Sequence, residues 1–284
     1  MTANASIRPS PIAGSWYSAD AGKLSSEINS YLDAAALPKL PGQVLGLIAP
    51  HAGYIYSGAT AGYAYRAVSG LHFDLCVVVS PLHQYLPYPL ITSAHQAYAT
   101  PLGQVEIDQP ALEAFQEHLL SAGLGNLQPV ANDREHSLEI QLPFLQTALA
   151  GSFKLIPLMV RSADPDFLQQ TALALSKVVN KSRVLLVAST DLSHFYDDKT
   201  ANQLDKGMLK HMTDFSPERV LQAEADETGF ACGSGAVALV LWLSKYLGGD
   251  HVTLLHYDTS ATTSRDRSSV VGYGALAITR PEVN

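Results

Sequence analysis

Three histidines stand at equivalent places in the sequence, because each closely follows an apolar run that predicts a β-strand. They are His51 after residues 43–49, His83 after residues 73–80 and His194 after residues 183–189. Ligands of α/β proteins bind beyond the carboxyl ends of the strands, and neighbouring strands lie about 5 Å apart, so three such imidazoles can converge. Imidazole is the commonest metal ligand in proteins and exchanges protons near neutral pH. One such histidine would be explained as a turn residue, but three predict a shared site.

A fourth histidine, His136, stands directly before a helix predicted over residues 137–149. The positive end of a helix dipole disfavours a protonated imidazole, and a neutral imidazole can bind a metal or accept a proton. The same segment also has a simpler interpretation, in which Ser137 and Glu139 only begin the helix. His136 is therefore a candidate that depends on the other histidines.

A cysteine stands at the start of another predicted helix. Cys232 directly precedes the apolar helix expected over residues 235–247. A helix N-terminus lowers the pKa of a thiol, and the thiolate is the form that binds metals. The alternative is a small residue packed at a helix start. Cys76 lies within a run of valines and is predicted to be a core residue.

Tyrosines gather in the segment after His51, at positions 54, 56, 63 and 65. Their rings can form apolar walls with a polar tip and so line a substrate cleft. They fit equally well as ordinary half-buried aromatic residues, and the sequence favours neither interpretation.

The elements that must position these residues alternate along the chain. Nearly continuous β-branched and apolar runs predict strands at residues 43–49, 73–80, 154–160, 183–189, 251–257 and 270–278. Helical spacing of apolar residues predicts helices at residues 22–35, 109–121, 137–149, 165–179, 199–213 and 235–247. Strands that are apolar on both faces need covering on both sides. We therefore predict an α/β fold, a three-layer α/β/α sandwich with a mostly parallel, mixed central sheet, formed by residues 1–284 as a single domain. The last two strands are expected to be antiparallel.

Composition excludes several classes of protein. Hydrophobic residues make up 47% of the chain, which is enough to build a core and excludes disorder. Lysine and arginine number 18 against 26 acids, so the net charge of −8 disfavours nucleic acid and anionic membranes as partners. The apolar run at residues 236–243 is far shorter than the ~20 residues of a membrane span, and residues 1–14 have no apolar signal core. Two cysteines cannot form a disulfide framework, and we expect a cytoplasmic protein.

Six separated motifs, in order, resemble those of the Memo family, whose prokaryotic members are called AmmeMemoRadiSam system protein B. The motifs are Ala13-Gly14-Ser15-Trp16-Tyr17, Ala49-Pro50-His51-Ala52-Gly53-Tyr54, Pro81-Leu82-His83, Glu135-His136-Ser137-Leu138-Glu139-Ile140-Gln141-Leu142-Pro143, Asp191-Leu192-Ser193-His194 and Cys232-Gly233. The resemblance covers essentially the whole chain. This family is similar in fold to the class III (LigB-type) extradiol dioxygenases, which are non-haem iron enzymes.

The resemblance implies roles for individual residues. It makes His51, His83 and Cys232 the ligands of one metal ion, iron first, with copper or zinc as alternatives because thiolate is a soft donor. It makes His194 the catalytic histidine, with His136 and Asp191 lining the site, and in a redox mechanism we expect Asp191 to orient His194. Trp16 and Tyr54 are then expected to contact the substrate. The family name also implies association with AMMECR-type and radical S-adenosylmethionine proteins.

Three functions fit these observations. The first is a metal-dependent redox enzyme or dioxygenase-like protein, acting on a small molecule or peptide in a cleft at the carboxyl ends of the strands. The second is a non-catalytic module that uses the same cleft to bind a peptide or a partner protein. The third is a zinc-dependent hydrolase, since two histidines, one cysteine and an open position suit zinc.

Overall fold

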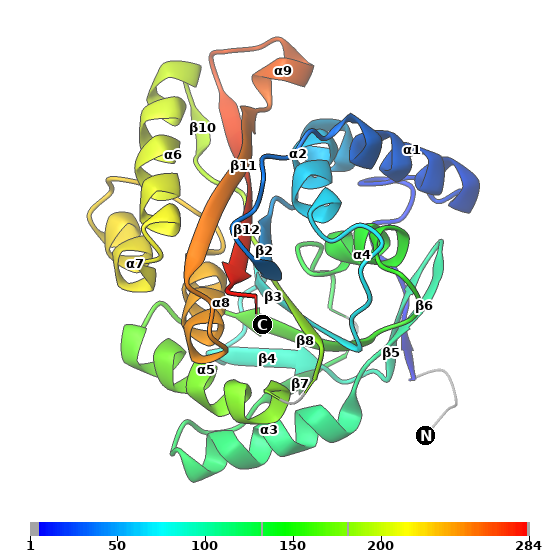
Figure 1. The fold of residues 1–284 in the computed structure, drawn as a ribbon, viewed down its shortest axis with the longest axis vertical. Helices are drawn as coiled ribbons and strands as arrows, with labels where there is room; N and C mark the ends of the chain where they lie inside the picture. Colours follow the sequence, from blue (N-terminus) through cyan, green and yellow to red (C-terminus); the bar gives the residue numbers. More distant parts are fainter. Residues whose placement is uncertain (1–5, 132, 181, 283–284) are drawn as a thin grey trace.

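A mixed sheet runs through the centre of the molecule (Figure 1). The computed structural model describes residues 6–131, 133–180 and 182–282. The strand order is β10 (His194–Tyr196), β12 (Val270–Arg280), β2 (Gln43–Ala49), β9 (Val184–Ser189), β3 (Leu75–Pro81), β8 (Lys154–Val160), β4 (Leu90–Ser93) and β7 (Gln128–Val130). A ninth strand, β11 (His251–Thr259), pairs with β12.

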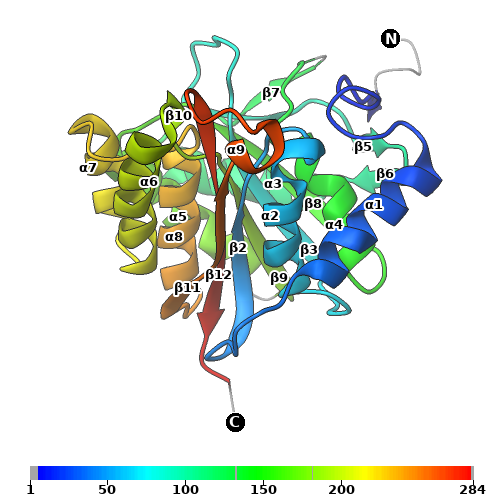
Figure 2. The same cartoon turned by 90° about the horizontal axis from the view of Figure 1, so that it is seen from above.

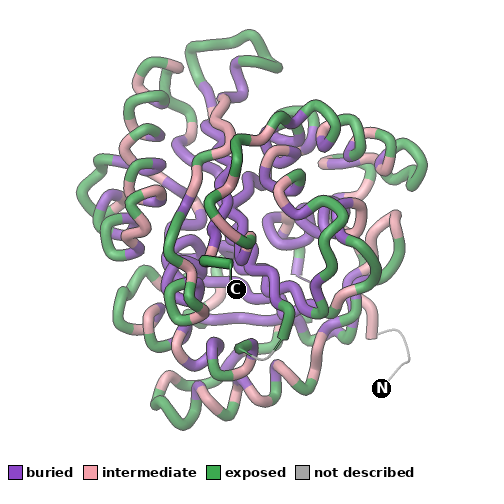
Figure 3. The backbone as a smooth tube through the Cα atoms, viewed as in Figure 1, coloured by how far each residue is buried: buried purple, intermediate pink, exposed green. Residues whose placement is uncertain are grey.

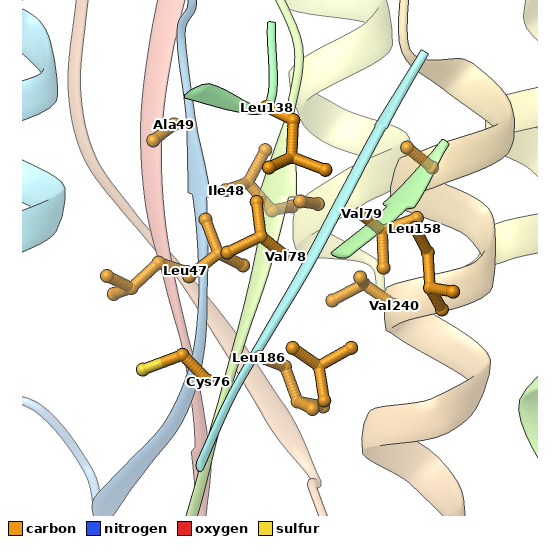
Figure 4. Packing of buried hydrophobic residues seen from close by; sticks show 14 of the residues in the cluster. Leu47, Ile48, Ala49, Cys76, Val78, Val79, Leu138, Leu158, Leu186 and Val240 are labelled. Carbon is orange, nitrogen blue, oxygen red and sulfur yellow. The ribbon is translucent and has the colours of Figure 1, made fainter. Parts of the chain in front are cut away.

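The four central strands, β2, β9, β3 and β8, are parallel to one another. Every residue of β3 and of β9 is buried, which explains their continuous apolar sequences. Figure 4 shows Leu47, Val78 and Leu186 of three of these strands packed together in the core. β12 is antiparallel to both β2 and β11, so the predicted mixed sheet is confirmed.

Helices cover both faces of this sheet (Figure 2). One layer holds α1 (Ala21–Ala34), α2 (Tyr54–Arg66) and α4 (Leu142–Ala148). The other holds α5 (Pro165–Val179), α6 (Asp198–Thr213), α7 (Pro217–Ala225) and α8 (Ser234–Tyr246), and α3 (Gln109–Ser121) packs on α5. The three-layer α/β/α sandwich is therefore confirmed. In the burial view (Figure 3) the central strands are buried, while the outer helices alternate between buried and exposed residues.

Helix α8 is apolar on every side because it lies between the sheet and the helices α5 and α7. All its residues from Ser234 to Ser244 are buried. This packing accounts for the longest apolar run of the chain. Within the described ranges, no helix is long and apolar enough to cross a membrane.

Several elements were not predicted from the sequence. Helix α2 is one of them, because its tyrosines and glycines do not form a clear apolar stripe. Its glycines are needed for close packing on α1: a side chain at Gly58 or Gly62 would lie within 3 Å of Tyr31. A small second sheet of β1 (Ile7–Arg8), β5 (Ala97–Thr100) and β6 (Gly103–Glu106) was also missed, as were α7, β4, β7, β10 and the short α9 (Ala261–Ser264).

The helix predicted over residues 137–149 begins later than expected. A short 3₁₀ turn, η1 (Glu139–Gln141), leads into α4, which has Pro143 in its first turn. The amide groups of His136 and Ser137 bond instead to the carboxylate of Glu135. His136 consequently lies in a loop in front of the helix.

Candidate metal centre

Three imidazoles converge at the carboxyl ends of the central strands. Nitrogen atoms of His51, His83 and His136 all lie within 4.8 Å of one another. The ring centroids of His83 and His136 are 4.8 Å apart, and each is 5.4 Å from the ring of His51. Such a group of donor atoms could hold one metal ion.

The sheet order explains why residues so distant in sequence meet. His51 follows β2 and His83 follows β3, and these strands flank β9 on its two sides. His136 comes from the loop before η1, where the Ser137 hydroxyl donates to the carbonyl oxygen of Pro81 at the end of β3, 3.0 Å away. Strand topology thus places two imidazoles, and a loop contact brings the third to them.

The tautomer of His51 follows from its hydrogen-bond partners. The Ser189 hydroxyl donates its single hydrogen to the carbonyl oxygen of Ser137 (2.6 Å) and accepts one from the Gln141 amide (2.8 Å). Its remaining lone pair faces His51 Nδ1 at 3.0 Å, so that nitrogen must donate. The lone pair of His51 is therefore on Nε2, the nitrogen suited to bind a metal.

Glu135 is the shared partner of the other two imidazoles. One of its carboxylate oxygens lies 2.9 Å from Nδ1 of His83 and 3.3 Å from Nδ1 of His136. The backbone N–H of His83 donates to the other oxygen at 2.6 Å. Although burial opposes ionisation, these hydrogen bonds hold the pKa of Glu135 well below its ordinary value. An ionised Glu135 directs Nε2 of His83 away from itself, as partners of metal-bound histidines commonly do.

Burial keeps two of the imidazoles neutral. It lowers the pKa of His51 well below the ordinary value, and the neighbouring imidazoles lower it further. It also lowers the pKa of His136 to about 4. The hydrogen bond to Glu135 raises the pKa of His83 instead. Neutral imidazole is the metal-binding form, so His51 and His136 fit a cation as they are, whereas a metal must compete with a proton at His83.

Cys232 touches the imidazole group through His51. Its Sγ lies 3.1 Å from His51 Nε2 and accepts from the backbone N–H of Asp191 at 3.3 Å. A nitrogen and a sulfur bound to the same metal at about 2.0 and 2.3 Å would be separated by a similar distance. Cys232 does not belong to the three-residue group with donor atoms within 4.8 Å, as far as the described residues show.

The expected low pKa of the Cys232 thiol is wrong. Burial and the nearby Asp191 carboxylate raise this pKa well above its ordinary value. The cost of burying a thiolate thus outweighs the favourable helix end. Gly233 permits the burial, because a side chain there would lie 2.4 Å from the carbonyl oxygen of Ser189.

Asp191 and His194 line the same cleft. The expected hydrogen bond from His194 to Asp191 is not formed, because each residue has another partner. The Asp191 carboxylate accepts from the backbone N–H of His51 at 2.7 Å. His194 Nδ1 lies 2.8 Å from the carbonyl oxygen of Leu192, which orients the ring in place of Asp191. Burial raises the pKa of Asp191 to about 7 and lowers that of His194. Asp191 can therefore exchange protons near neutral pH, whereas the lowered pKa keeps His194 neutral there and able to accept a proton.

The histidines open into a cavity of about 760 Å³. Trp16 lines this cavity, and its ring centroid lies 4.1 Å from that of His136. Tyr54 does not line it among the described residues. Its side chain is only 3% exposed and its hydroxyl donates to the carbonyl oxygen of Ile140. The phase of helix α2 turns Tyr54 into the core and Tyr56 towards the cleft, so the structure places Tyr56, and not Tyr54, in the lining of the cleft.

Glu135, Ser189 and Gln141 were missed as functional residues. Glu135 directly precedes His136, and an acid beside a candidate ligand is a usable signal. Ser189 and Gln141 carry no such signal, since their contacts with each other cross 48 residues of sequence.

Comparison with known proteins identifies the family of this chain. A family model described as Memo-like protein matches residues 8–277. A MEMO1 family protein from Nitrosopumilus maritimus is 32% identical over 274 residues, which span 95% of this chain and 98% of that protein. Another from Thermotoga neapolitana is 32% identical, spanning 94% and 98%, and one from Ignicoccus hospitalis is 31% identical, spanning 97% and 99%. The chain belongs to the Memo family.

Proposed function

We propose that this protein is a metal-dependent redox enzyme that acts on a substrate bound in the histidine-lined cleft. The proposal rests on one observation above all: three imidazoles from separate segments lie together with their donor atoms within 4.8 Å. His51 is buried, His136 is partly buried and His83 is exposed at the cleft, and a buried imidazole without a polar partner is costly. A bound cation satisfies the free nitrogen atoms.

The geometry of the site and the family resemblance both assign His51 and His83 as metal ligands. The geometry adds His136 to them, and the family resemblance adds Cys232. Imidazole and thiolate donors suit iron, copper and zinc. Iron or copper supplies one-electron transfer and an open position for an exchangeable ligand.

The residues around the metal ligands supply proton transfer. Asp191 has a pKa of about 7 and lies in the cleft beside His51, so it takes or gives a proton near neutral pH. His194 lies in the same cleft, with the Leu192 carbonyl oxygen holding its Nδ1–H and leaving Nε2 free as a base. Trp16 positions the substrate next to His136.

Zinc-dependent hydrolysis is the second candidate. Two histidines and a cysteine with one open position are a common catalytic zinc set, and Cys232 Sγ lies 3.1 Å from His51 Nε2. In that case Asp191 would accept the proton of the attacking water.

The test is metal content together with oxygen consumption. Protein prepared without added metal is expected to retain about one equivalent of iron or copper, and His83→Ala is expected to lose it. His72→Ala is the matched control, because His72 is exposed and bonds to Ala150 and Asp74 instead. Cys232→Ser identifies whether sulfur is a ligand.

The same measurement separates the candidates. Retained zinc with ester or amide hydrolysis would favour the hydrolase. Correctly loaded iron or copper without metal-dependent oxygen consumption, across a panel of reductants and aromatic substrates, would contradict the redox proposal.

A further inference from the structure

The mouth of the cleft carries large apolar side chains that face solvent. Phe195 is 76% exposed, Ile55 69% and Tyr56 45%. All three line the cavity that contains the histidines. Exposed apolar side chains gathered around a concave site are typical of ligand binding.

Phe195 is held in a conformation that bulky residues avoid. Its φ angle is +65°, in the left-handed region. The pairing of β10 with β12 is irregular between His194 and Tyr196, so Phe195 lies at a bulge. Its ring meets the ring of His194 edge-on, with 5.6 Å between centroids. A side chain that is both strained and exposed lowers stability, and strain of this kind concentrates at ligand-binding positions.

The charges at the cleft are acidic. Among the described residues that line it, Asp191 and Asp266 are present and lysine and arginine are not. Two arginines flank Asp266 in sequence, but neither lines the cavity, and Arg267 pairs with Asp198 at 2.7 Å. An anionic group at this mouth therefore finds neither a lysine nor an arginine, and His83, whose pKa Glu135 raises, lies with the other imidazoles at the metal centre.

Asp266 is a fixed negative charge close to the apolar mouth. The hydroxyl and the backbone N–H of Ser268 both donate to its carboxylate and hold its pKa below the ordinary value. The loop that carries it is tied to Ile55, because the Thr263 hydroxyl donates to the Ile55 carbonyl oxygen at 3.2 Å. Asp266 lines the same cavity as the exposed rings of Phe195 and Tyr56, and a carboxylate and aromatic faces both attract an organic cation.

We propose that the mouth of this cleft binds an organic cation, with its apolar body against Phe195, Ile55 and Tyr56 and its ammonium group facing Asp266. The proposal deepens the proposed function, because it names the substrate class of the same cleft and rests on that function for the reaction. Phe195 is then the residue that selects for an apolar body, and Asp266 the residue that selects for positive charge.

The test uses three probes of one shape and different charge: benzylamine, benzyl alcohol and benzoate. Each is titrated into the protein as purified, with binding followed by ligand-observed NMR at pH 7. We expect benzylamine to bind about tenfold more tightly than benzoate. The Asp266→Asn substitution is expected to lower the affinity for benzylamine to that for benzyl alcohol.

Phe195→Gly separates binding from stability. Glycine accepts a positive φ, so this variant is expected to melt at a higher temperature while its affinity for both benzylamine and benzyl alcohol falls about fivefold. Phe195→Leu keeps an apolar side chain and is expected to lose less affinity. Tyr85→Ala removes an aromatic residue that is 81% exposed outside the cleft and is the control that should change nothing.

Two results would overturn the proposal: benzoate binding as tightly as benzylamine, or unchanged affinities in Phe195→Gly. Neither depends on turnover. Wild-type protein that selects benzylamine but holds no metal, or consumes no oxygen, would refute the proposed function alone. Wild-type protein that has redox activity but does not prefer the amine would refute this inference alone.

Discussion

At the scale of single residues, the chemistry of the centre depends on which ring nitrogen of each histidine is free. Ser189 fixes the tautomer of His51, and Glu135 accepts from Nδ1 of His83. These partners hold the rings before any ligand arrives. Metal binding therefore requires little reordering of the imidazole rings, because their orientation is already fixed.

Replacing Glu135 with glutamine tests this positioning role. The amide removes the negative charge beside His83 and His136, so metal affinity is expected to fall by about 10–100-fold. Competition with a chromophoric chelator measures it. Glu106→Gln is the control, since Glu106 is exposed and its ion-pair partner among the described residues is Lys154, at 3.6 Å. Equal affinity in Glu135→Gln and wild type would show that this carboxylate does not support the ligands.

Sequence reasoning at this scale succeeded where the chemistry was tied to strand ends. His51 and His83 were found because each directly follows a strand that the apolar pattern reveals. Glu135 and Ser189 were missed because their importance comes from three-dimensional neighbours. The prediction of a low pKa for Cys232 was wrong for a similar reason. Burial raises this pKa, and a position at the start of a helix does not reveal that burial.

At the scale of elements, the short strand β1 fastens the N-terminal segment to the loop that carries His136. The Arg8 guanidinium bonds to both carboxylate oxygens of Asp133 at 2.7 and 2.9 Å, to the Glu135 carbonyl oxygen at 2.7 Å, and to Glu139. The side chain of Arg8 is 1% exposed. One buried cation thus organises the segment from Asp133 to Glu139.

Arg8→Met is expected to be strongly destabilising, because it leaves two buried carboxylates without their cation. The expected loss is about 3–5 kcal/mol of unfolding free energy. Arg66→Met is the matched control: Arg66 is exposed and its carboxylate partner is 3.9 Å away, so about 1 kcal/mol or less is expected. Urea denaturation measures both. Similar midpoints for the two variants would refute the anchoring role.

Asp205 joins α6 to the His194 segment and to β11, and it makes stability depend on pH. Its carboxylate accepts from the Ser193 N–H at 2.9 Å and the Tyr257 hydroxyl at 2.8 Å, while burial raises its pKa above the ordinary value. The folded state then holds this proton more tightly than the unfolded state. Its contribution to stability is full below about pH 4 and is lost as the pH rises through the folded-state pKa.

Asp205→Asn stays neutral, so its stability relative to wild type is expected to increase as the pH rises above about 4. Asp197→Asn should show the opposite trend. Thr200 hydrogen bonds lower the pKa of Asp197, so the wild-type advantage from this helix cap should shrink as the pH falls. Thermal melts across the pH range compare them, and parallel curves for Asp205→Asn and wild type would contradict the burial argument.

Elements were predictable where one periodicity dominated. The buried parallel strands and the amphipathic helices α1, α3, α5 and α6 follow from their sequences. Helix α2 does not, because its glycines serve a close contact with Tyr31 that only the folded chain reveals. β1 is two residues long and has no periodicity to detect.

At the scale of the whole molecule, the central sheet brings the residues of the site together. Its parallel strands end at one edge, and the loops from that edge carry the candidate ligands. The sandwich was predictable because alternating strands and helices admit few arrangements. Its small side sheet was not, because all three of its strands are short and β1 lies far in sequence from the adjacent strands β5 and β6.

Metal binding should stabilise the whole fold, because the ligands come together only in the folded state. Free metal at about 100 times its dissociation constant adds about 2.7 kcal/mol, equivalent to several degrees of melting temperature. Chelation is expected to reverse this shift in wild type and to have no effect on His51→Ala. Identical melting temperatures with and without metal would show that the site holds none.

The most direct measurement is the X-ray absorption spectrum of the protein loaded with one equivalent of zinc. Ligation by His51 and His83 predicts nitrogen neighbours at about 2.0–2.1 Å with the outer-shell scattering of at least two imidazoles, and sulfur at about 2.3 Å would identify Cys232 as a further ligand. A first shell made only of oxygen, without imidazole scattering, would contradict the metal centre.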